Sequence, residues 1–181
     1  MSFFKAIGRL PWSARIGLLI LSFFAMCILF APWIAPYGES QIVGDVWEPI
    51  GGTFSVGTDQ IGRDLLSRLV YGARNTISLA LLTTALAFLF GGLLGFLAAT
   101  MRGWVDQLLS RFVDIIISIP TLIFALIVLS AVGTSIPVLI SVIGLVYAMP
   151  VYRIARAVAM DIEIMDYVEV ARLRGEGLWW I

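Results

Sequence analysis

The feature that most constrains this chain is an uncharged apolar run at residues 16–34. At about 1.5 Å per residue, a helix of this length crosses the roughly 30 Å hydrocarbon layer of a membrane. Trp12 and Trp33 lie at its two ends, where indole rings favour the membrane interface. The run is long for a signal peptide, and no A-x-A-like cleavage site follows it. We therefore expect a spanning helix here.

Three more apolar segments follow a polar stretch at residues 35–74. The chain is 60% apolar and 13% charged, against roughly 45–50% and about 25% in a soluble domain. Such a chain cannot bury its apolar surface in a core of its own. The expected fold class is all-α, a polytopic membrane helix bundle with further spans at residues 76–100, 112–132 and 136–151.

Basic residues are divided unequally between the two sides of this four-span topology. One side has Lys5, Arg9, Arg15, Arg102, Arg111, Arg153, Arg156, Arg172 and Arg174, and the other has Arg63, Arg68 and Arg74. Lysine and arginine resist translocation, so the side with more of them is expected to be cytoplasmic. The N-terminus, the loop between the second and third spans and the C-terminal tail are therefore predicted to lie in the cytoplasm.

Several chemistries are excluded by residues that the chain lacks. It has no histidine, and Cys27 is its only cysteine, so we expect no catalytic residue and no metal or other cofactor site. Lys5 is the only lysine and no P-loop occurs, so ATP hydrolysis is expected in a separate partner subunit. Twelve basic and twelve acidic residues cancel, which gives no net charge to recruit nucleic acid.

Within the predicted spans, Asp114 is the only carboxylate near the apolar layer. It follows Arg111 by three residues, a spacing that allows a local ion pair on a helix. We interpret it as a structural anchor near the interface. A proton or ion relay is the alternative, and the lack of a deeper acid argues against ion-coupled transport.

Glycines and prolines interrupt the apolar segments. Gly91, Gly92 and Gly95 could let another helix approach closely, although glycine is also common in membrane helices. Pro120 and Pro150 each remove a backbone donor and are expected to kink the third and fourth helical stretches.

Residues 57–71 have the pattern of a short amphipathic helix on the outer side. Thr58 and Asp59 are good capping residues, and Asp64 and Arg68 are four apart and can pair. The helix would lie on the outer membrane surface or pack against a partner's outer loops.

A second helical segment begins at Asp166 and runs up to Leu173, and Gly175 is suited to end it in a left-handed turn. Tyr167, Val170, Ala171 and Arg174 fall on one face. The segment would insert into a groove on a cytoplasmic partner or lie on the membrane surface, and its spacing does not decide between the two.

Both segments resemble a known family. Glu169, Val170 and Ala171, followed after three residues by Gly175, resemble the E-A-A-x-x-x-G loop of ABC importer permeases, with Val170 where the motif has its second alanine. The outer segment is similar to the outer-loop signature of their dipeptide/oligopeptide/nickel branch at Gly57, Thr58, Asp59, Gly62, Arg63, Asp64, Ser67 and Arg68.

The resemblance implies a type I ABC importer permease subunit in a bacterial-type cytoplasmic (inner) membrane. It would translocate short peptides or a related small solute, surrounded by membrane lipid and without nucleic acid. Its implied partners are a second permease subunit in a heterodimer, two cytoplasmic ATPase subunits docked through the E-A-A loop, and an extracytoplasmic substrate-binding protein. The alternatives are an ion-coupled secondary carrier or channel subunit and a membrane-anchored scaffold.

The resemblance also implies a domain organisation. Residues 1–34 would form the N-terminal cytoplasmic segment and first span, 35–75 an extracytoplasmic loop with the short helix, and 76–181 the start of the permease core with its coupling loop. The sequence stops at Ile181, before the I-x-L-P that closes the motif and before two further spans expected of the family. We expect a longer permease to contain this segment.

Overall fold

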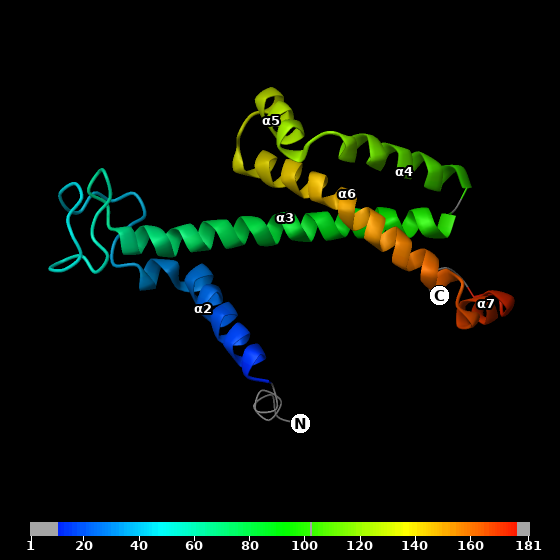
Figure 1. Ribbon diagram of the computed structural model, residues 1–181, viewed down its shortest axis with the longest axis horizontal. Coiled ribbons are helices and arrows are strands. Elements are labelled where there is room, and N and C mark those ends of the chain that lie inside the picture. The colour runs from blue at the N-terminus through cyan, green and yellow to red at the C-terminus, as the bar shows by residue number, and fades with distance from the viewer. Residues whose placement is uncertain (1–10, 102, 177–181) are drawn as a thin grey trace. The chain divides into compact units, whose positions relative to one another are not determined.

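The computed structural model describes residues 11–101 and 103–176 (Figure 1). Their regular structure is helical, and the only bridges are isolated pairs in the loop between the first two helices. The helices are α2 (Trp12–Ile34), α3 (Leu65–Met101), α4 (Gly103–Ser118), α5 (Thr121–Val132), α6 (Ile136–Glu163) and α7 (Asp166–Leu173). The all-α prediction is confirmed. Lys5, Arg9 and Arg102, which the orientation argument counts, lie outside the described residues.

The chain divides into two compact units, Met1–Leu79 and Ala80–Ile181. Within the described ranges, three helices (α2, α3 and α6) are long and apolar enough to cross a membrane, and the bent pair α4 and α5 makes a fourth if it is one span. The polytopic membrane prediction is therefore confirmed.

In α2 the backbone is non-helical at Phe30, near Pro32 inside the last turns, and Trp12 and Trp33 are exposed near the two ends of the helix.

The third predicted span, at residues 112–132, is wrong as a continuous helix. The helix is interrupted between Ser118 and Thr121, and α4 and α5 meet at an angle of 93°. Pro120 has no N–H to donate to α4, and its ring disfavours the helical conformation in Ile119. Pro120 instead precedes α5 with a non-helical backbone (φ −53°, ψ 126°), and its carbonyl accepts the N–H of Phe124. The pair is therefore a broken span or a re-entrant loop.

The fourth predicted span, at residues 136–151, is too short. Helix α6 continues through Pro150 and ends only at Glu163, so it has 28 residues. Arg153 and Arg156 therefore belong to the helix rather than to a tail that follows it. Arginine is a good helix former, and the carboxylates of α4 supply partners for both charges.

The short outer helix predicted within residues 57–71 is also wrong as a separate element. Helix formation begins at Leu65 and continues without interruption to Met101, so its first turns and the second span form one helix of 37 residues. No proline separates the two parts, and Gly72 is tolerated inside the helix. Residues 57–64 are irregular.

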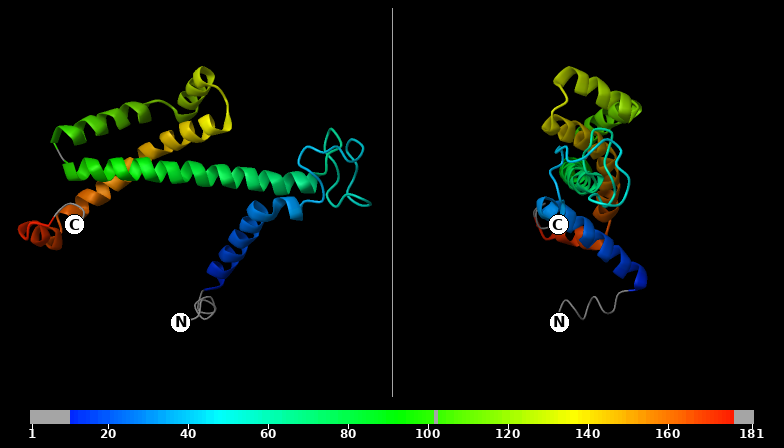
Figure 2. Two further views of the ribbon diagram at one scale, coloured as in Figure 1. Left: turned by 180° about the vertical axis from the view of Figure 1, so that it is seen from behind. Right: turned by 90° about the vertical axis from the view of Figure 1, so that its left-hand side faces the viewer.

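Within the second unit, α3 and α6 lie side by side (Figure 2). Two glycines of α3 lie at their close contact. A Cβ atom at Gly91 would collide with the carbonyl oxygen of Ala148, and one at Gly95 would lie 2.6 Å from that of Tyr152. Gly92 has open space around it. The close helix packing that the glycine pattern allowed therefore occurs at Gly91 and Gly95. Ala98, Val113, Met149 and Tyr152 form the buried cluster beside it.

Candidate functional site

The outer-loop signature folds into a hydrogen-bonded cluster before α3, centred on Asp59. This carboxylate accepts the backbone N–H groups of Ile61 (2.9 Å) and Arg63 (3.0 Å), and it pairs with the guanidinium groups of Arg63 (2.8 Å) and Arg68 (2.6 Å). Burial raises the pKa of the Asp59 carboxyl, but the hydrogen bonds from Arg63 and Ile61 outweigh it and hold that pKa well below its ordinary value. Asp59 is therefore a charged centre that organises the loop.

Asp64 caps α3, because the helix begins at the next residue. Its carboxylate accepts the backbone N–H (2.8 Å) and hydroxyl (2.6 Å) of Ser67, whose oxygen accepts the backbone N–H of Tyr37 at 3.0 Å. Asp64 and Ser67 are both buried. The predicted ion pair between Asp64 and Arg68 is wrong, since Arg68 pairs with Asp59 instead.

Thr58 fastens the preceding loop rather than the helix. Its hydroxyl donates to the carbonyl of Asp45 (2.6 Å) and accepts the backbone N–H of Glu48 (2.8 Å). The predicted helix caps at Thr58 and Asp59 are therefore wrong. Gly62 has φ +79°, and a side chain there would collide with the carbonyl oxygen of Gly44. These contacts bring all the signature residues into one small structure.

Replacing Asp59 by asparagine is expected to loosen this cluster, because both arginines lose their ionic partner. Limited proteolysis should then cut residues 35–64 faster, whereas Glu39→Gln, which alters an exposed hydrogen bond to Asn75, should change the rate little.

The same cluster should depend on pH, because folding lowers the pKa of Asp59. The stability that the Asp59 carboxylate gives the loop is present above the ordinary pKa of about 3.9, and it is lost only as pH falls through the lower pKa of the folded state. The wild-type loop should stay resistant at pH 5. Equal cleavage of the two variants would contradict this role.

Two ion pairs connect α4 to α6. Arg156 binds Asp106 with two nitrogens, at 2.5 and 2.6 Å, and these side chains are 30% and 20% exposed. Arg153 contacts Asp114 at 2.5 Å, and these side chains are 54% and 59% exposed. Asp114 therefore pairs across helices, and the predicted local pair with Arg111 is wrong. Sequence reasoning missed both pairs because it ended the fourth span before Arg153.

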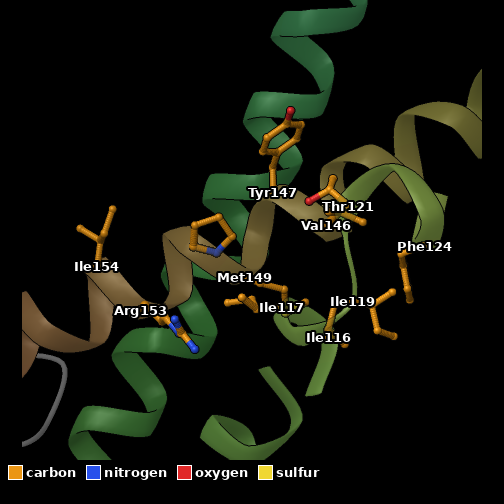
Figure 3. Close-up of a pocket in the computed structure, with 11 residues that line it drawn as sticks. Ile116, Ile117, Ile119, Thr121, Phe124, Val146, Tyr147, Met149, Arg153 and Ile154 are labelled. Atoms are coloured by element: carbon orange, nitrogen blue, oxygen red, sulfur yellow. The ribbon is translucent and has the colours of Figure 1, made fainter. Parts of the chain in front are cut away.

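A pocket of about 370 Å³ opens beside the break between α4 and α5 and next to Pro150 of α6 (Figure 3). Most of its lining side chains are apolar, among them Ile116, Ile119 and Phe124. Thr121 and Tyr147 provide hydroxyl groups at one end, and Arg153 lies at the other end. Its volume falls within the roughly 300–1,000 Å³ typical of small-molecule sites. The pocket can therefore hold a small, largely apolar solute.

The helix predicted at the tail is confirmed, and so is its end at Gly175. Helix α7 ends at Leu173, Gly175 has φ +78°, and the N–H of Glu176 returns to the carbonyl of Ala171 at 3.2 Å. This bond belongs to a Schellman-type helix end, which requires the left-handed residue. Val168 and Ala171 are buried.

The opposite side of α7 is open. Glu169 and Val170 are exposed, as are Tyr167 and Leu173. Ala171 is buried and Val170 is exposed, so these two residues do not share one face of the helix as their spacing predicts. The helix is thus fixed through its small apolar side, and its open side carries a carboxylate and a valine.

Comparison with known proteins relates both units to transport components. Residues 91–181 match the family model described as the binding-protein-dependent transport system inner membrane component, and residues 12–45 match the N-terminal TM domain of oligopeptide transport permease C.

Similar curated proteins come from several bacteria. The di/tripeptide transport system permease protein DppC of Pseudomonas aeruginosa is 36% identical, over 89% of this chain and 55% of its own length. The dipeptide transport system permease protein DppC of Haemophilus influenzae is 30% identical, over 91% and 58%. The probable D,D-dipeptide transport system permease protein DdpC of Escherichia coli is 32% identical, over 88% and 54%. This chain therefore spans somewhat more than half the length of these relatives.

Proposed function

Because this chain belongs to the family of binding-protein-dependent transport system inner membrane components, we propose that it is part of the permease subunit of an ATP-driven peptide importer. The observation that carries this proposal is the similarity to three permeases named for dipeptide or di/tripeptide transport, each over 88–91% of the chain. The apolar helices agree with a role inside the membrane. The names of these relatives favour such an importer over an ion-coupled carrier or channel.

Energy would come from partner subunits. No P-loop occurs in this sequence. In the proposed importer, ATP hydrolysis would belong to two cytoplasmic ATPase subunits. Helix α7 is the element we assign to docking them, because Val168 and Ala171 are buried while Glu169 and Val170 remain exposed. Glu169, Val170, Ala171 and Gly175 together make the coupling segment.

The outer cluster would serve assembly on the other side of the membrane. Asp59, Asp64 and Ser67 are buried and satisfied by neighbouring groups, so the loop has a defined shape rather than a variable one. A loop of fixed shape suits contact with the second permease subunit or with an extracytoplasmic substrate-binding protein.

Its bacterial relatives lead us to assign the protein to a bacterial inner membrane. We take α4 and α5 as one broken span, so that the nine-to-three division of basic residues predicts an N-terminus in the cytoplasm. Single cysteines at Ser40 and Gln107, in a Cys27→Ser background, should then react with an impermeant maleimide from opposite faces. Ser40 should be labelled from outside in intact cells, and Gln107 only after the membrane is opened. Labelling of both from the same face would contradict this orientation.

The partner composition is tested by purifying the tagged full-length protein from its native membrane in a mild detergent. We expect a second permease subunit and nucleotide-binding subunits to co-purify, and the ATPase activity of the complex to rise when binding protein and peptide are added. Recovery of the protein without any ATPase subunit would overturn the proposed function.

A further inference from the structure

The two ion pairs between α4 and α6 hold their arginines to different degrees. One arginine has a structural role, and the other is available to a ligand. Arg156 is held by two hydrogen bonds to Asp106 and is mostly shielded from solvent. Arg153 makes one contact to Asp114, and both side chains are more than half exposed. Arg153 uses one guanidinium nitrogen on Asp114, so its other donors are open to a second anion.

Among the described residues that line the pocket beside Pro120 and Pro150, Arg153 is also the only one with a charged side chain. A cationic group at the wall of an apolar cavity in a membrane helix is costly, and such residues generally mark a substrate or ion pathway. The guanidinium group matches the geometry of a carboxylate and can bind it through two parallel hydrogen bonds. The pocket therefore combines an apolar volume with one anion-binding group.

We propose that this pocket is a peptide subsite and that Arg153 binds the terminal carboxylate of the transported peptide through the donors that it does not use on Asp114. The apolar wall formed by Ile116, Ile119 and Phe124 then contacts the peptide side chains, and Thr121 and Tyr147 face its polar backbone from the other end (Figure 3). This inference rests on the proposed function, because it names the chemical group by which the permease recognises a peptide.

The test uses the full-length protein with its partner subunits in proteoliposomes. Radiolabelled alanyl-phenylalanine and its C-terminal amide are supplied to the wild type and to Arg153→Gln. We expect Arg153→Gln to raise the KM for the free dipeptide by about tenfold or more, the loss that follows from removing a charge-assisted contact. Uptake of the amide should change little. The wild type and Arg153→Gln are supplied by the same binding protein. Its preference for one peptide over the other therefore cancels when uptake of each peptide is compared between the two permeases.

Two further variants separate carboxylate binding from a structural role. Arg111→Gln removes a positive charge from an exposed position on α4 that does not line the pocket, and it should leave the KM unchanged. The double variant Asp114→Arg, Arg153→Asp restores an ion pair of reversed polarity. A purely structural pair would be rescued by this exchange, whereas carboxylate binding would not, so rescue would overturn the proposal.

A second measurement leaves Arg153 unchanged and so does not depend on how its variant folds. A cysteine at Thr121, in a Cys27→Ser background, should react with a small maleimide in the assembled transporter, and alanyl-phenylalanine should slow the reaction while its amide should not. Absence of labelling would show that another helix fills the pocket and would overturn the inference. Failure of the wild type to import the dipeptide would overturn the proposed function, whereas import that is indifferent to Arg153 would overturn this inference alone.

Discussion

Gly175→Val is expected to abolish ATP-driven uptake while the protein still inserts into the membrane. Gly175 has φ +78° at the end of α7, where a side chain is strained by about 1–2 kcal/mol, and the β-branched valine is among the worst residues for this conformation. The strain competes with the bond from Glu176 to Ala171 that closes the helix. The end of the proposed coupling segment should therefore lose its shape.

The matched control is Gly175→Asn, because asparagine tolerates the left-handed conformation far better than valine. Recovery of ATPase subunits with the tagged protein and peptide uptake should both be near normal for Gly175→Asn and low for Gly175→Val. Glu169→Lys keeps the backbone but reverses the exposed charge of α7, and it should lower ATPase recovery as well. Normal recovery and uptake in both Gly175→Val and Glu169→Lys would mean that α7 is only a surface helix.

Gly91→Val is expected to cause the largest loss of stability in the membrane-spanning part. Its Cβ atom would collide with the carbonyl oxygen of Ala148 and lie 2.8 Å from the Cβ atom of Val151. Backbone cannot move aside as the end of a flexible side chain can, so α3 and α6 must separate. Overpacking of this kind costs about 1–3 kcal/mol and often more where backbone is involved.

Gly92→Val, one residue along the same helix, is the control, since a Cβ there would meet no described atom of another helix within 4 Å. Thermal unfolding of the purified full-length permease in detergent should show a lower midpoint for Gly91→Val than for Gly92→Val. Both substitutions lower helix flexibility equally and add the same apolar volume. The difference between the two unfolding midpoints therefore reports the contact of α3 with α6 alone. Equal midpoints would contradict the close packing at Gly91.

The features that sequence reasoning predicted well are those set by residues near one another in the chain. Apolar runs gave the membrane helices, and Gly175 marked the end of α7. Pro120 indicated an interruption, but its consequence, a 93° bend, depends on how α5 packs against α6 and cannot be read from the proline alone.

The features that it missed depend on contacts between distant residues. The span predicted at residues 136–151 ends before Arg153 and Arg156, yet Asp114 and Asp106 on α4 supply partners for these charges 39 and 50 residues away. A similar effect governs the outer loop, where Ser67 is fixed by Tyr37 across 30 residues. Local helical spacing favoured other pairs, and only the folded loop brings these groups together.

Uptake by a purified system distinguishes an ATP-driven importer from an ion-coupled carrier. The full-length protein is reconstituted in proteoliposomes with its second permease subunit, its ATPase subunits and its binding protein, and uptake of alanyl-phenylalanine is measured with ionophores that remove every ion gradient. We expect uptake that requires both ATP on the ATPase side and the binding protein, and that persists without a gradient. Uptake that proceeds without ATP and stops when the ion gradient is removed would contradict it.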